Sequence, residues 1–329
     1  MPSLNANNPL TEGELVAALS NFQIDGKLAI ACSGGVDSMC LTYMAAKNFD
    51  VIALIIDHGL REESKEEAAK TAKILDALGI ENQILSEDRA ADSNISSNIN
   101  SNVQAQARQL RFDLLTSFCK ENGIDALATA HHAEDNAETV LLKLSRGSGV
   151  DGLTGILPES EMDGVRIIRP LLAFTKSQLQ ECLLQGGIQW VEDPTNGTDK
   201  YKRNKLRHLL AEIEDAELVT SRLNDTAENM RRVRDYLELQ TQAALAECFD
   251  GEILDIQNFG NLHDEIAYRV LVQIVMAKAQ PKQRPRFEKI KSLKTALLNG
   301  QVRTLAGLSF RPQDSRDGAD IVIKLEKEI

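Results

Sequence analysis

Short runs of Val, Ile and Leu alternate with longer stretches of helical periodicity along the first part of the chain. The apolar runs lie at 28–32, 51–56, 83–85 and 126–130, and each has the length of a strand. Such alternation predicts βαβ units, in which right-handed helical crossovers join parallel strands. The predicted fold class is therefore α/β, with a doubly wound, mostly parallel, Rossmann-like sheet whose ligands lie beyond the carboxyl ends of its strands.

The second part of the chain has a different pattern. The alternation gives way near residues 210–220 to long helical patterns, and 329 residues suffice for two cores. We therefore predict a catalytic domain over 1–215 and a smaller, mostly α-helical domain over 216–329. A strand pair, formed by 301–310 and 319–328, is expected to close the second domain.

Composition restricts the class of protein. The longest apolar run falls short of the roughly 18 residues that span a bilayer, and the polar start lacks the apolar segment of a signal peptide. The five cysteines include no CxxC pair, which argues against a disulfide framework, a zinc ribbon or an iron–sulfur site. We expect a cytoplasmic protein with free thiols and no membrane partner. Trp190 is expected to pack in the core.

The first strand is followed by the sequence SGGVDS, which has the character of an anion site. Its glycines allow a ligand to approach the backbone, and the helix that follows offers unpaired N–H groups and a positive dipole end. A glycine pair alone is more often a tight turn, but six matched positions in a strand–loop–helix context favour a phosphate site. The nucleotide-binding positions predicted here are Ser33, Gly34, Gly35, Val36, Asp37 and Ser38.

The loop has no lysine, unlike the familiar GxxxxGK[ST] phosphate loop. Asp37 would repel a bare phosphate and makes sense if a divalent cation lies between them. The backbone N–H groups and serine hydroxyls of the loop suit a metal-bound pyrophosphate. This pyrophosphate would be the leaving group of a reaction at the α-phosphate. The sequence therefore indicates an adenylation reaction.

Histidines, acids and arginines follow in two later helices. His132 opens a helix in which Asp135 and Glu138 are three residues apart and share a face. Arg108 and Arg111 share a face of a helix expected at 103–121. Each group has an ordinary alternative: helix-start histidines are usually surface or capping groups, and single arginines usually form exposed ion pairs.

The SGGVDS loop matches the SGGxDS signature of the PP-loop ATP pyrophosphatases. Further segments narrow the resemblance, and they occur in the order DHGLR (57–61), ARQLRF (107–112), TAHHAEDNAETVLLKLSRGSG (129–149), RPLL (169–172) and WVEDPTNGTDKYKRNKLRH (190–208). Together they resemble the tRNA(Ile)-lysidine synthase family, in its compact type with one C-terminal domain. The resemblance covers about 28–209 and continues weakly through 299–307.

This resemblance implies an ATP-dependent carbon–nitrogen ligase that converts ATP to AMP and diphosphate. Such an enzyme joins free lysine to C2 of the wobble cytidine of a tRNA(Ile) with the CAU anticodon, through an adenylated cytidine. The modified anticodon reads AUA instead of AUG. The implied cofactors are ATP and Mg²⁺, and the implied partners are that tRNA and lysine. The oligomeric state stays open, a homodimer included.

The resemblance also assigns roles to residues. The catalytic positions are Asp37, Arg108, His132, Asp135 and Glu138, and the metal ligands are Asp37 and Asp135. The positions assigned to substrate or tRNA are Arg111, Arg146, Lys202, Arg203, Asn204 and Arg207. Basic segments at 200–207 and 281–294 are predicted to bind phosphates, although basic runs are usually solvated helix faces.

Two positions depart from the family's usual HHxDDQxET, because Glu134 and Asn136 replace Asp and Gln. Two alternatives therefore remain: another PP-loop tRNA-modifying enzyme, such as a cytidine thiolase, or an inactive nucleotide- or tRNA-binding protein. The first would need sulfur-handling cysteines, usually CxxC pairs, which the sequence lacks. The second is opposed by the presence of Ser33, Asp37, His132 and Asp135.

Overall fold

The computed structural model describes residues 8–57, 62–86, 102–191, 215–281, 283–315 and 318–325. The chain divides into two compact units, Met1–Asn229 and Met230–Ile329. The division falls inside one long helix, α9 (Ala216–Cys248). The domain boundary expected at 215 stays a prediction.

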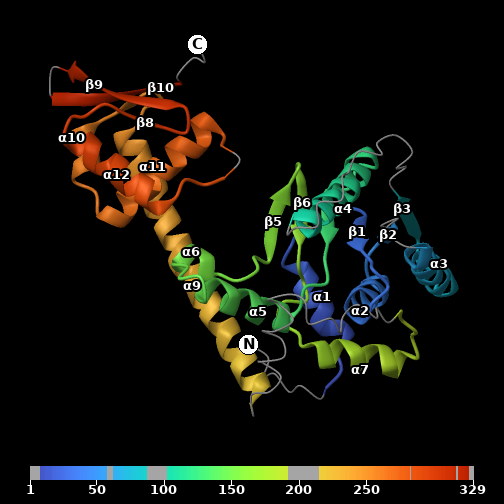
Figure 1. Cartoon of the computed structure of the whole chain (residues 1–329). Coiled ribbons are helices and arrows are strands. Elements are labelled where there is room, and N and C mark those ends of the chain that lie inside the picture. The colour runs from blue at the N-terminus through green and yellow to red at the C-terminus, as the bar shows by residue number, and fades with distance from the viewer. Residues whose placement is uncertain are drawn as a thin grey trace. The chain divides into compact units, whose positions relative to one another are not determined.

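The first unit is built on a six-stranded sheet with the order β3-β2-β1-β4-β6-β5 (Figure 1). Its strands are β1 (Leu28–Ala31), β2 (Val51–Asp57), β3 (Asn82–Ser86), β4 (Ala126–Ala128), β5 (Glu159–Met162) and β6 (Val165–Ile168). All pairs are parallel except β5 with β6. The four strands expected from the apolar runs are confirmed, and β5 and β6 extend the sheet beyond them.

Helices cover both faces of this sheet, as the α/β prediction requires. They are α1 (Glu12–Ser20), α2 (Val36–Ala45), α3 (Glu62–Ala77), α4 (Asn102–Glu121), α5 (Ala133–Leu144), α6 (Val150–Leu153) and α7 (Lys176–Gly186). The alternation within β1 divides the core: Leu28 and Ile30 pack with residues of α1, α2, α3 and α7, whereas Ala29 packs with residues of α4. Trp190 packs against the first cluster, as expected.

Local signals explain where several helices begin. Thr11 caps α1 and Thr175 caps α7, each in a reciprocal pair with the acid or amide three residues later. The helix expected at 103–121 is confirmed as α4. The Ser/Asn-rich segment at 92–102, expected as a surface loop, lies outside the described residues except for Asn102, which begins α4.

The second unit has its own core between helices and a four-stranded antiparallel sheet. Besides the end of α9, it contains α10 (Ile256–Gly260), α11 (Asp264–Ala279) and α12 (Phe287–Leu298). The strands β7 (Ile253–Leu254), β8 (Arg303–Leu305), β9 (Leu308–Ser315) and β10 (Gly318–Leu325) have the order β7-β10-β9-β8. The unit is mostly helical, and the expected strand pair corresponds to β8, β9 and β10, of which β9 and β10 form the central pair.

All five cysteines are buried free thiols. No helix in the described part of the chain is both long and apolar enough to cross a membrane.

Candidate active site

The SGGVDS loop joins the carboxyl end of β1 to the start of α2. Gly34 has φ +84°, in the left-handed region that favours glycine. Gly35 is the N-cap of α2 and brings no capping side chain, so the first N–H groups of α2 are left for a ligand. A residue distant in the chain also holds the loop backbone in place, because the Val191 N–H donates to the Gly34 carbonyl over 2.8 Å.

The two serines of the loop form one hydrogen-bond network. The Ser33 N–H donates to Ser38 Oγ over 3.1 Å, the two hydroxyls lie 3.2 Å apart, and Ser38 Oγ donates to the Gly35 carbonyl over 3.1 Å. Ser38 is buried. Its hydroxyl therefore stabilises the conformation of the loop by bonding to Ser33 and Gly35. The sequence alone does not distinguish this role from direct phosphate binding.

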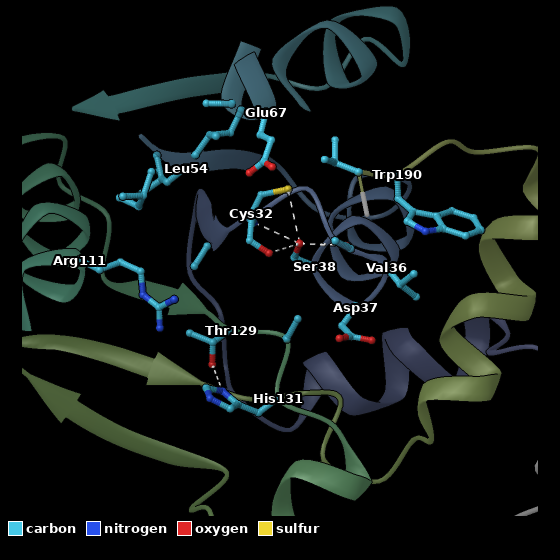
Figure 2. A pocket seen from close by; sticks show the side chains of 18 of the residues that line it. Cys32, Val36, Asp37, Ser38, Leu54, Glu67, Arg111, Thr129, His131 and Trp190 are labelled. Carbon is cyan, nitrogen blue, oxygen red and sulfur yellow. Dashed lines mark hydrogen bonds between the residues drawn. The ribbon is translucent and has the colours of Figure 1, made fainter. Parts of the chain in front are cut away.

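A cavity of about 690 Å³ opens over this loop, within the size range of small-molecule sites. Leu54, Ile56, Phe112 and Leu115 form part of its apolar wall. Charged and polar side chains come from several elements: Asp37 from α2, Glu67 from α3, Arg111 from α4, His131 after β4 and Lys176 from α7. Figure 2 shows the carboxylates of Asp37 and Glu67 and the guanidinium of Arg111 around this space.

His132 stands at the start of α5, among three carboxylates. Its Nε2 lies 3.7 Å from Asp37 Oδ2 and 3.4 Å from Asp135 Oδ2, and its Nδ1 lies 2.8 Å from Glu134 Oε2. Only 4% of His132 is exposed. The cluster therefore links the loop helix α2 to α5.

The pKa values of Asp37 and His132 are both raised. Burial raises the pKa of the Asp37 carboxyl, and the charges of His132 and Lys176 only partly offset that effect. Burial alone would lower the pKa of His132, but the Glu134 hydrogen bond and the neighbouring carboxylates outweigh it and raise the pKa. A raised pKa favours the imidazolium, which donates from both ring nitrogens.

One carboxylate oxygen of Asp37 is positioned to bind a ligand. Asp37 Oδ1 is buried and has no hydrogen-bond partner among the described residues. A buried carboxylate oxygen without a donor is costly, and a hard cation such as Mg²⁺ is a suitable partner for it. Asp37 and Asp135 therefore fit a divalent cation in chemistry, although the described residues contain no preformed group of three or more ligating side chains.

Glu134 joins α5 to α7. Besides contacting His132, its carboxylate accepts the Lys176 N–H, with both oxygens 3.1 Å from that nitrogen. A second connection runs alongside, because the Ala133 N–H donates to the Phe174 carbonyl over 2.9 Å. Glu134 thus orients the His132 ring and fixes the first residue of α7.

Asn136 has a structural position, away from the cavity lining. It is buried, its Nδ2 donates to Asn224 Oδ1 of α9 over 2.8 Å, and its Oδ1 accepts the Ile156 N–H over 2.6 Å. Asn224 Nδ2 in turn donates to the Ala133 carbonyl over 3.2 Å. The amide therefore ties α5 to the turn after α6 and to α9.

The predicted site residues fall into four groups, apart from Gly34, which belongs to the loop but is not among the lining residues. The cavity lining contains Ser33, Gly35, Val36, Asp37, Ser38 and Arg111. The cluster at Asp37 adds His132 and Asp135, whereas Glu138 is buried in α5 and Arg146 is exposed beyond its end, both outside the lining. The Arg108 side chain and the residues Lys202, Arg203, Asn204 and Arg207 lie outside what the structure describes.

Sequence reasoning missed Glu67 and Lys176. Both line the cavity, from helices that begin at Glu62 and at Lys176, far from the SGGVDS loop in the chain. Trp190 also lines the cavity while packing on the core. No local motif marks these residues, although a parallel sheet with crossover helices predicts that distant loops meet at one edge.

The basic segment at 281–294 belongs to the second unit. Lys294 is buried and forms an ion pair with Asp264, so its charge is engaged within the fold. Arg286, Lys289 and Lys291 are exposed, and Lys291 lines a hollow of about 300 Å³ together with Thr295 and Arg303. Together with Arg284, which is also exposed, these are the described cations of the segment that remain accessible to phosphates.

Comparison with known proteins identifies relatives over most of the chain. Residues 10–214 match the PP-loop domain family. The tRNA(Ile)-lysidine synthase of Anaplasma marginale is 34% identical over 316 residues, which cover 92% of this chain and 66% of that protein. The tRNA(Ile)-lysidine synthase of Wolbachia pipientis wMel is 36% identical over 302 residues, which cover 87% of this chain and 68% of that protein. The chain thus spans about two thirds of the length of these relatives.

A solved structure with a similar fold is the U34-tRNA thiolase NcsA from Methanococcus maripaludis, determined with its [4Fe-4S] cluster. The TM-score is 0.57 at 18% identity, and the match covers 67% of this chain and 76% of that chain. At this identity the likeness concerns the fold alone.

Proposed function

Because this chain belongs to the tRNA(Ile)-lysidine synthases, a family within the PP-loop proteins, we propose that it ligates lysine to the wobble cytidine of tRNA(Ile) with the CAU anticodon. ATP supplies the activation. The observation that carries the proposal is Asp37: it belongs to the SGGVDS loop, lines the cavity and has one buried carboxylate oxygen to which no described residue donates.

The proposed first step takes place over the loop. The C2 oxygen of the cytosine attacks the α-phosphorus of ATP, a phosphorus–oxygen bond forms, and pyrophosphate leaves toward the N–H groups at the start of α2. His132 donates a hydrogen bond to the α-phosphate as negative charge develops there, which its raised pKa supports. Asp37 and Asp135 would hold Mg²⁺, which supplies charge neutralisation at the phosphates.

The proposed second step replaces AMP by lysine. The lysine amine attacks C2 of the adenylated cytidine, a carbon–nitrogen bond forms, and AMP leaves with the C2 oxygen. The amine must first lose a proton, and Asp135, at the start of α5, is the proposed acceptor. Arg111 lines the same cavity and offers a planar guanidinium to the base or to a phosphate.

The tRNA is proposed to reach this site through basic side chains. Arg108 and Arg146 are proposed contacts on or near helices of the first unit, and Lys202, Arg203, Asn204 and Arg207 are proposed tRNA contacts in the 200–207 segment. The exposed cations of the 281–294 segment would add phosphate contacts.

The thiolase alternative has less support. The solved thiolase shares the fold at 18% identity and carries an iron–sulfur cluster. In this chain all five thiols are buried, and the described residues contain no cluster of metal-ligating side chains. A cytosolic ligase in which no thiol takes part agrees better with these facts.

Transfer of label from α-³²P-ATP tests the order of the two steps. With an unmodified tRNA(Ile) CAU transcript and no lysine, the label should enter the tRNA as pyrophosphate is released. Adding lysine should then release it as AMP. Asp37→Ala should abolish the transfer while tRNA binding persists. Label that reaches lysine instead of tRNA would contradict the mechanism, and ATP binding without pyrophosphate release would favour the inactive binder.

A further inference from the structure

We propose that Lys176 binds the polyphosphate of the bound nucleotide and so supplies, from α7, the cation that the SGGVDS loop lacks. This inference rests on the proposed function, because it assumes that ATP occupies the cavity. It assigns a residue that no loop motif includes.

The loop alone leaves the phosphates short of positive charge. Its side chains are two hydroxyls, a valine and the Asp37 carboxylate, and its remaining donors are backbone N–H groups. A nucleoside triphosphate carries several negative charges close together, and hydrogen bonds from a cation to phosphate are about twice as strong as neutral ones. The proposed Mg²⁺ would offset part of this charge, and a cationic side chain near the loop would offset more of it.

Among the residues that the structure describes, three side chains that can carry positive charge line the cavity, and two of them have local contacts. His131 Nδ1 lies 2.9 Å from Thr129 Oγ1, and the Arg111 guanidinium lies over the Phe112 ring, 5.6 Å from its centroid. Lys176 differs from both. It is exposed at the cavity edge, and in the described part of the chain its ammonium forms no ion pair.

The backbone that carries Lys176 is held firmly. Thr175 and Gln178 form a reciprocal capping pair, in which the Thr175 N–H donates to Gln178 Oε1 over 2.9 Å and the Gln178 N–H donates to Thr175 Oγ1 over 3.3 Å. The Lys176 N–H itself donates to Glu134. The root of the side chain is thus fixed while its ammonium end stays available, which suits a residue that must meet a ligand.

Lys176 also lies within electrostatic reach of the loop. Burial is the main cause of the raised pKa of Asp37, and the Lys176 charge counteracts it. A phosphate seated on the start of α2 would therefore lie in the field of this ammonium. Because an ammonium repels the ammonium of substrate lysine, its partner in the cavity is an anion.

Equilibrium binding to Lys176→Gln, with ATP and with adenosine as separate probes, tests the inference. The variant should bind ATP about tenfold or more weakly, since a hydrogen bond between charged groups is lost. Adenosine, which has no phosphate, should bind as it does to the unchanged protein. Lys176→Arg should restore most of the ATP affinity. Lys120→Gln is the matched control, because Lys120 is exposed at the end of α4 and does not line the cavity.

Three results would overturn the inference. Unchanged ATP affinity in Lys176→Gln, together with normal α-phosphate transfer to tRNA, would refute the role of Lys176 and leave the proposed function standing. Equal losses of ATP and adenosine affinity would mean that Lys176 acts on the shape of the cavity. If the unchanged protein binds no ATP, the proposed function and the inference fall together.

Discussion

At the scale of single residues, Gly34 is specified by its backbone and by its neighbour. Its φ of +84° disfavours any residue with a Cβ atom. A Cβ placed there would also lie 2.2 Å from Thr71 Oγ1, which donates to the Glu67 carbonyl over 2.9 Å and would lose that hydrogen bond if it moved. The loop can thus approach α3 so closely only because position 34 is glycine.

We expect Gly34→Ala to destabilise the first unit and to abolish ATP binding, because the loop must move away from Thr71. Gly79→Ala is a control that has the backbone strain of a positive φ without the steric clash. Gly79 has φ +70°, but nothing lies within 4 Å of the added Cβ atom. That control should cost about 1–2 kcal/mol of unfolding free energy. Equal losses in both variants, measured by chemical denaturation, would show that Thr71 is irrelevant.

Glu134 belongs to the same scale, because it orients one histidine. Glu134→Gln keeps the length but removes the negative charge opposite His132, so the pKa of His132 should fall. The rate of α-phosphate transfer should decrease by roughly tenfold to hundredfold, because a hydrogen bond to a charged group contributes about 1.5–3 kcal/mol. Nitrogen-15 NMR of the His132 ring measures the pKa directly, and single-turnover transfer measures the rate.

The pH dependence of stability follows from the same contact. In the folded protein the pKa of His132 lies above its ordinary value of about 6.5. Its protonation therefore contributes stability below about pH 6.5, and that contribution is lost as the pH rises through the folded pKa. Glu134→Gln should reduce this pH-dependent part. An unchanged pKa of His132 in Glu134→Gln would contradict the role given to Glu134.

At the scale of elements, the start of α5 is fixed on two sides. Glu134 and Ala133 attach it to the start of α7, and Asn136 and Asn224 attach it to α9. The two departures from the family's usual motif thus lie in contacts between helices. A longer amide at position 136 would have to enter the space beside Gly155, where a Cβ atom would already lie 2.1 Å from Asn136 Oδ1.

Asn136→Ala should lower the free energy of unfolding by about 1–3 kcal/mol, because the part-buried Ile156 N–H and the Asn224 amide lose their hydrogen bonds to Asn136. Asn136→Gln should cost a similar amount through overpacking. Asn224→Ala completes a double-mutant cycle, in which a coupling near zero would contradict the proposed link. Asn122→Ala, at an exposed position near the end of α4, should be nearly neutral.

At the scale of the whole molecule, an acidic protein is proposed to bind an acidic polymer. The net charge of −12 opposes long-range attraction to RNA, so the affinity must come from local basic segments. One lysine of the 281–294 segment is engaged with Asp264, which leaves fewer cations for phosphates than the sequence suggests. The 281–294 segment then keeps five other Lys and Arg residues, the same number as the 200–207 segment.

Replacing Lys202, Arg203 and Arg207 together by Gln should weaken tRNA binding and flatten its salt dependence. If each side chain neutralises one phosphate, the slope of log K against log salt concentration should become smaller by about 2–3. Replacing Lys70, Lys73 and Lys120 changes the net charge equally at exposed positions outside the cavity lining. An equal loss of tRNA affinity in both triple variants would mean that only the net charge matters and would contradict direct contacts by the 200–207 segment.

The sequence predicts the parts of this molecule that depend on neighbours in the chain. Strands β1, β2 and β4 are buried apolar runs, and the SGGVDS loop is one contiguous segment, so both were predicted. Strand β5, with the sequence ESEM, lies at the edge of the sheet and has no apolar run to mark it. Glu67 and Lys176 reach the cavity only through tertiary packing, which no local pattern encodes.

The central claim is that lysine becomes attached to one particular tRNA. The measurement that tests it most directly is incorporation of radiolabelled lysine into an unmodified tRNA(Ile) CAU transcript with ATP and Mg²⁺, with tRNA(Met) as the control. If this chain is the proposed ligase, tRNA(Ile) alone should become labelled, and only when ATP is present. Absence of label from both RNAs, despite release of pyrophosphate, would contradict the claim and require another acceptor for the adenylating site.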